Sequence, residues 1–228
     1  MPKPPSFPVI LRDATSIGLG VAAYGVSFGA LGTTTGLDVW QTLALSALMF
    51  TGASQFALVG VLGAGGSTAS AVAAALLLGF RNLAYGVRMN ELIAPRGWRR
   101  PLAAHLTIDE STAMGLAHEA ADHGREGGRW AFWTTGLSVF FWWNLATLLG
   151  AAGANLASDP RALGLDSAVS AGFLALLWPQ LKGRREWQIG LLAFTAGFLA
   201  IPWLAPGLPI ILGGVVAVVL VLAVRREA

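Results

Sequence analysis

The chain contains no cysteine, which excludes a disulfide framework and any metal site built from thiolates. Charged residues are scarce, at 12% of 228 residues, and there are only three histidines. His118 and His123 are five residues apart, whereas the zinc-binding spacing that places two histidines on one helix face is four. The sequence shows no nucleotide-binding loop and no pairing of a nucleophile with a base. We therefore expect no metal, no cofactor and no enzymatic activity.

Apolar residues make up 55% of the chain and occur in long runs rather than in amphipathic stripes. The net charge is +3, but Lys and Arg gather in short clusters at the ends of these runs. That placement indicates membrane topology and argues against nucleic-acid binding. The pattern predicts an all-α, multi-pass membrane protein in the lipid bilayer, with about seven transmembrane or re-entrant helices in a single domain. The predicted spans are residues 15–36, 39–63, 69–87, 130–156, 168–181, 187–204 and 208–224.

Two segments fall outside these spans. We assign residues 1–13 to a disordered tail, and residues 89–129 to a hydrophilic link that carries an amphipathic helix over residues 102–121. The basic clusters are consistent with one cytoplasmic face, which places the N-terminus outside unless one early segment is re-entrant. Gly36-Leu37-Asp38 and Gly164-Leu165-Asp166 precede the second and fifth spans, which suggests an inverted repeat.

Arg81 is the one formal charge within the apolar run 69–87. A cation in a lipid-facing segment costs roughly 2.5 to 3.5 kcal/mol on insertion scales, so such a residue normally faces a protein interior or a wet cavity. Arg81 is therefore a candidate binding residue. The alternative is that it snorkels to the interface together with Arg88, which lies one heptad further on the same helix face.

The first span carries glycines at intervals of four, three and four residues, which places them on one stripe of a helix. They are Gly25, Gly29, Gly32 and Gly36. Such a stripe allows another helix to approach closely. It also weakens the helix, so local unwinding of residues 27–32 beside a substrate is the alternative.

In the second span, Thr51, Ser54 and Gln55 place three hydrogen-bonding side chains on one sector of a helix. A Gln amide in hydrocarbon needs partners. These partners are either neighbouring helices or a ligand.

The hydrophilic link contains an acidic pair. On a helix over residues 102–121, Asp109 falls on the apolar stripe, and Glu110 is one step around the helix. An acid on an apolar face needs a cation, so the two acids are candidate counter-ions of Arg81, a proton site, or both. We expect Arg81 to be paired with one of them in the absence of substrate. The alternative is a peripheral amphipathic helix whose acids face water.

Four motifs occur in an order that resembles the AzlC family of branched-chain amino acid permeases. They are Phe28-Gly29, Phe50-Thr51-Gly52-Ala53-Ser54-Gln55-Phe56, Arg81-Asn82 followed by Tyr85-Gly86, and Leu106-Thr107-Ile108-Asp109-Glu110-Ser111. The similarity extends over nearly the whole chain, although family members more often have Ala where Thr51 stands. Members of the family are associated with azaleucine resistance and valine export.

The resemblance implies the large subunit of a two-component exporter in the cytoplasmic (inner) membrane, working with a small AzlD-type membrane protein. We expect a secondary transporter that exports branched-chain or similar apolar amino acids, driven by the proton gradient because the chain has no nucleotide site. An accessory or scaffold subunit without a transport site is the alternative. The candidate substrate-binding residues are Phe28, Gly29, Gly52, Ser54, Gln55, Arg81 and Asn82, and the candidate ion-pair and proton-binding residues are Asp109, Glu110 and Arg81.

Overall fold

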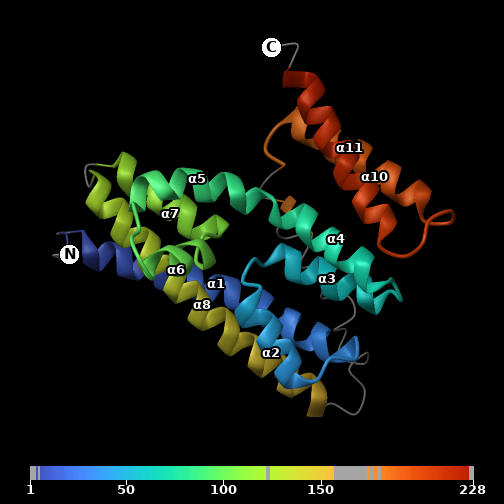
Figure 1. Cartoon of the computed structure of the whole chain (residues 1–228), viewed down its shortest axis with the longest axis horizontal. Helices are drawn as coiled ribbons and strands as arrows, with labels where there is room; N and C mark the ends of the chain where they lie inside the picture. Colours follow the sequence, from blue (N-terminus) through green and yellow to red (C-terminus); the bar gives the residue numbers. More distant parts are fainter. Residues whose placement is uncertain are drawn as a thin grey trace.

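The computed structural model describes residues 4, 6–121, 124–156, 174, 177, 178 and 181–225. These residues form helices and no strand, which confirms the predicted all-α class (Figure 1). Within them, three helical segments are long and apolar enough to cross a membrane, and further helices are apolar but shorter. The three segments are Phe7–Thr34, Thr68–Ile93 and Gly124–Ala154. The segment around Gly164 that suggested an inverted repeat, and most of the predicted span 168–181, lie outside the described residues.

The two longest helices, α1 (Phe7–Thr34) and α8 (Gly124–Leu156), pack side by side along most of their length (Figure 1). The glycine stripe of α1 makes this contact possible. A Cβ at Gly25 would lie 2.9 Å from the carbonyl oxygen of Trp143, and one at Gly29 would collide with the carbonyl oxygen of Thr147. The glycines therefore serve close helix packing. Because α1 is helical without interruption to Thr34, the alternative of local unwinding over residues 27–32 is wrong.

The helix α1 also starts earlier than expected. It begins at Phe7, with a proline in its first turn, so the assignment of residues 7–13 to a disordered tail is wrong. Ile10 and Ala14 are fully buried, and Ser138 Oγ on α8 donates a hydrogen bond to the carbonyl oxygen of Ala14 at 2.9 Å. Packing against α8 thus stabilises the first turns of α1, which the few apolar residues before position 15 did not predict.

The second predicted span is divided into α2 (Val39–Leu48) and α3 (Ala53–Gly63). The break falls at Gly52, whose φ of 61° and ψ of −94° lie where L side chains are strained. The third span is likewise divided into α4 (Thr68–Gly79) and α5 (Arg81–Ile93), on either side of Phe80. Neither division interrupts the apolar run, so hydropathy alone predicted continuous spans.

The hydrophilic link folds into α6 (Arg99–His105) and α7 (Asp109–Ala120), so the prediction of one helix over residues 102–121 is wrong. The reason is local. Ser111 Oγ accepts a hydrogen bond from the Ile108 amide at 3.1 Å and donates one to the carbonyl oxygen of Leu106 at 2.6 Å. Ile108 is extended, and its Ser111-capped turn makes Asp109 the first residue of α7.

Near the end of the chain, α10 (Arg184–Ala200) and α11 (Leu208–Arg225) form a hairpin (Figure 1). Its second helix, α11, packs against α4. None of the residues of α10 is buried, and its exposed side chains include Phe194 and Phe198. An exposed apolar surface of this kind suits contact with lipid.

Candidate substrate site

A small cavity lies where the breaks in the helices meet. Its wall contains residues from the α2–α3 break, the first residue of α5 and the first two residues of α7, together with side chains from α1 and α8. The lining residues are Val21, Tyr24, Phe50, Thr51, Gly52, Ala53, Arg81, Ile108, Asp109, Glu110, Val139 and Trp143. The cavity volume of ≈ 40 Å³ corresponds to space for about three water molecules.

An ion pair crosses this cavity. Arg81 Nη1 lies 2.9 Å from Asp109 Oδ2, and the two side chains are 39% and 34% exposed. A second ion pair joins the same two helices further on, between Arg88 Nη2 and Glu119 Oε2 at 2.6 Å. The two ion pairs join α5 to α7, and they keep Asp109 in contact with Arg81.

Burial raises the pKa of both carboxyl groups above its ordinary value. For Asp109 the loss of solvation outweighs the opposing effect of the Arg81 guanidinium. For Glu110 burial again dominates, the backbone hydrogen bond to the carboxylate opposes it, and the charge of Asp109 adds to the increase. Both acids are therefore poised to take up a proton when a nearby cation is withdrawn.

Hydrogen-bond donors other than Arg81 also border the cavity. The first amides of α3 follow Gly52 without a side-chain cap, and Gly52 and Ala53 line the cavity. An uncapped helix N-terminus favours a negative charge. The Nε1 of Trp143 is buried and has no hydrogen-bond partner among the described residues. The site thus offers donors suited to a carboxylate, and carboxyl groups suited to an ammonium.

Of the predicted site residues, Gly52, Arg81, Asp109 and Glu110 line this cavity. Ser54 and Asn82 line a second, mainly apolar cavity of ≈ 650 Å³. Their Oγ and Oδ1 atoms are buried without a hydrogen-bond partner in the part of the chain that the structure describes. Phe50 and Thr51 line both cavities and therefore lie between them.

Gln55 is fully buried and does not line either cavity. Its Nε2 donates to the carbonyl oxygen of Ser46 at 3.0 Å. Ser46 belongs to the last turn of α2, where carbonyl groups lack a partner within the helix. Gln55 therefore joins α3 to α2 across the break. This contact corresponds to the first of the two alternatives from the sequence, in which the partner of the amide is a neighbouring helix and not a ligand.

Phe28 and Gly29 also lie away from the cavity. Phe28 is fully buried, with its ring 5.6 Å from that of Phe56 and 6.2 Å from that of Trp143. Gly29 faces the backbone of α8. Phe28 therefore packs against Trp143, and Gly29 allows α1 and α8 to approach closely.

The cavity is also lined by Tyr24, Val139 and Trp143, which are not among the candidate site residues predicted from the sequence. Trp142, the neighbour of Trp143 in the sequence, does not line the cavity. Trp142 instead packs beside Gly18 of α1. The one signal for Trp143 was a Trp deep in an apolar span, and it did not distinguish between these two adjacent residues.

Comparison with known proteins places the chain in a family. The family model described as AzlC protein matches residues 16–156. Two relatives from Helicobacter pylori, strain ATCC 700392 / 26695 and strain J99 / ATCC 700824, are each named "Uncharacterized membrane protein" and are each 29% identical to this chain over 168 residues. These matches cover 73% of this chain and 72% of each relative. No solved structure matches it.

The family match spans more than half of the chain and includes every residue that lines the cavity. The apolar helices and the membrane relatives agree that this is a membrane protein. The chain therefore belongs to the AzlC family, which is associated with branched-chain amino acid transport.

Proposed function

We propose that the chain is the large subunit of a proton-coupled secondary transporter that exports branched-chain or similar apolar amino acids across the cytoplasmic membrane, together with a small AzlD-type partner. The observation that carries this proposal is the Arg81–Asp109 ion pair at a cavity bounded by broken helices. Secondary transporters bind substrate at such helix breaks, where half-helix N-termini face anionic groups.

An amino-acid zwitterion needs a donor for its carboxylate and an acceptor for its ammonium. In our proposal Arg81 and the first amides of α3 bind the carboxylate, because a guanidinium binds a carboxylate through two parallel hydrogen bonds. Glu110 then faces the ammonium. Substrate and Asp109 compete for Arg81, since both offer a carboxylate.

That competition couples substrate to protons. Arg81 opposes the increase in the pKa of Asp109 that burial causes. When a substrate carboxylate takes over Arg81, this opposition weakens, so the pKa of Asp109 rises further and the group takes up a proton. Release of the substrate restores the ion pair and expels the proton, so substrate and proton cross the membrane in the same direction. Export in this scheme is driven by the outward gradient of the amino acid, and the proton accompanies it.

The structure represents a closed state in this proposal. A cavity of ≈ 40 Å³ holds the polar ends of an amino acid but leaves no space for a branched side chain. The neighbouring cavity of ≈ 650 Å³ is mainly apolar, and Phe50 and Thr51 separate the two. Displacement of these residues, which precede Gly52 in the break between α2 and α3, joins the polar groups to an apolar space.

The test is equilibrium binding of leucine to the purified protein, with and without its small partner. Wild-type protein should bind leucine, Arg81→Gln should lose binding, and Arg88→Gln should retain it. The matched control is informative because Arg88 forms an ion pair between the same two helices but does not line the cavity. Equal binding by wild type and Arg81→Gln would refute the proposed role of Arg81.

The second candidate is an accessory subunit in which the polar groups join helices. The position of Gln55 favours it, because this buried amide links α2 to α3. Absence of leucine binding both to the chain alone and to the chain with its partner would support this alternative over the transporter.

A further inference from the structure

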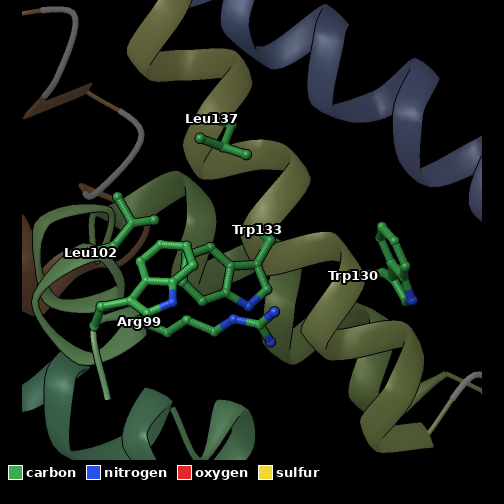
Figure 2. A pocket seen from close by; sticks show the side chains of 6 residues that line it. Arg99, Leu102, Trp130, Trp133 and Leu137 are labelled. Carbon is green, nitrogen blue, oxygen red and sulfur yellow. The ribbon is translucent and has the colours of Figure 1, made fainter. Parts of the chain in front are cut away.

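Two adjoining pockets lie between the start of α8 and the segment that connects α5 to α6. The first has a volume of ≈ 250 Å³ and is almost entirely apolar, and the second has a volume of ≈ 470 Å³ and is half polar. Trp98, Arg99 and Trp133 line both, so the two are continuous. Figure 2 shows Arg99 and Leu102 on one side of the first pocket, and Trp130, Trp133 and Leu137 along α8 on the other.

Among the described residues, the charged ones that line these pockets are all arginines: Arg96, Arg99 and Arg129. Arg96 and Arg99 are exposed, and neither forms an ion pair with a described residue. The Arg99 guanidinium carbon lies 5.8 Å from the centre of the Trp98 ring. Arg129 is held in place, because its Nε donates to the carbonyl oxygen of Leu92 at 2.9 Å. The second pocket therefore carries concentrated positive charge without a protein counter-ion among these residues.

The position of the pockets corresponds to a membrane interface. They lie where the apolar segment Thr68–Ile93 ends, and the first pocket extends along α8 to Leu137, which is 51% exposed. Trp98 is 72% exposed and its side chain borders both pockets. Tryptophan is enriched at the level of the lipid headgroups, where its ring is partly apolar and partly wet.

We propose that the two pockets together bind one anionic phospholipid. Its headgroup phosphate lies among Arg96, Arg99 and Arg129, since guanidinium groups bind phosphate through paired, charge-assisted hydrogen bonds. An acyl chain starts in the apolar pocket against Trp133 and Leu137. Basic pockets beside membrane helices bind anionic lipid headgroups in this way, and the apolar half of the site selects a lipid over a free phosphate.

The test measures lipid binding to the full-length protein in neutral detergent. Phosphatidylglycerol and phosphatidylcholine with the same acyl chains are titrated, and binding is followed by tryptophan fluorescence and by native mass spectrometry. Wild type should bind phosphatidylglycerol more tightly than phosphatidylcholine. Arg99→Gln should weaken phosphatidylglycerol binding by about fivefold, and Arg96→Gln combined with Arg99→Gln by about thirtyfold, as expected for arginines that contact an anionic lipid.

Arg100→Gln is the matched control. Arg100 is adjacent in sequence and carries the same charge, but its Nε donates to the carbonyl oxygen of Pro95 and its side chain lines a different cavity with Met89. This variant should change phosphatidylglycerol affinity by less than about twofold, because Arg100 lies outside the proposed site.

Three results would overturn the proposal. Equal affinity for the two lipids would remove the role of the arginines, and equal losses in Arg99→Gln and Arg100→Gln would show general attraction to positive charge. Displacement of the bound lipid by inorganic phosphate or by glycerophosphoglycerol at millimolar concentration would show a site for free phosphate groups. All of these measurements are independent of transport.

Discussion

Replacing Arg81 with Gln and Asp109 with Asn, singly and together, perturbs the ion pair on which the proposed mechanism depends. The pair is 2.9 Å long, and its side chains are 39% and 34% exposed. An exposed pair contributes about 0–1 kcal/mol, and breaking a fully buried pair costs about 3–5 kcal/mol. For this intermediate case we expect each single substitution to lower the free energy of unfolding by about 1–2 kcal/mol, because each leaves one partly buried charge without its partner.

The double variant should lose less than the sum of the two single variants, with a coupling of about 1 kcal/mol. The assay is denaturant unfolding in detergent, with leucine binding measured on the same samples. The Arg88→Gln and Glu119→Gln pair is the control, because it joins the same helices away from the cavity. Strictly additive losses at Arg81 and Asp109, or wild-type leucine binding in Arg81→Gln, would refute the reasoning.

Three further predictions concern other parts of the chain. Leucine binding should weaken as pH rises, because a protonated Asp109 does not compete for Arg81. The affinity should fall by up to tenfold per pH unit in the range between the pKa of Asp109 in the free protein and its higher pKa in the bound protein. Isothermal titration at several pH values checks this, and an affinity that does not change with pH would contradict proton coupling. Gln55→Leu should lower stability by roughly 0.6 kcal/mol or more while leucine binding persists, because Gln55 joins two helices; loss of binding at unchanged stability would instead indicate a substrate contact. Gly29→Ala should destabilise the protein strongly, since the added Cβ collides with Thr147 on α8. Gly20→Ala meets nothing within 4 Å and should stabilise the protein by about 0.5–1 kcal/mol. Thermal unfolding compares the two variants, and equal effects would contradict the packing of α1 against α8.

The all-α class and the ends of several spans could be predicted because apolar runs mark the segments that contact lipid and basic clusters mark their ends. The breaks could not. Gly29 and Gly52 look alike in the sequence, yet Gly29 permits a close helix contact and Gly52 adopts a φ of 61° immediately before the first residue of α3. Which of these constraints applies depends on residues distant in the sequence or on backbone geometry, and neither changes local hydropathy.

The candidate site shows the same limit. The partners of Arg81 could be narrowed to two adjacent acids from the sequence, because a buried cation requires compensation and few acids are near an apolar helix. The sequence did not separate Asp109 from Glu110. That choice depends on Ser111, whose hydrogen bonds start α7 at Asp109 and so set the rotation of the helix. A Ser two residues after an Asp is a common local pattern, and it acquires this meaning only once Ile108 is known to be extended.

The central claim is tested most directly by measuring leucine transport in proteoliposomes that contain the chain and its AzlD-type partner under an imposed pH gradient. We predict leucine movement that depends on the gradient, is abolished in Arg81→Gln, and persists in Arg88→Gln. Gradient-dependent transport at the wild-type rate in Arg81→Gln, or no leucine movement in the wild-type complex, would contradict the account.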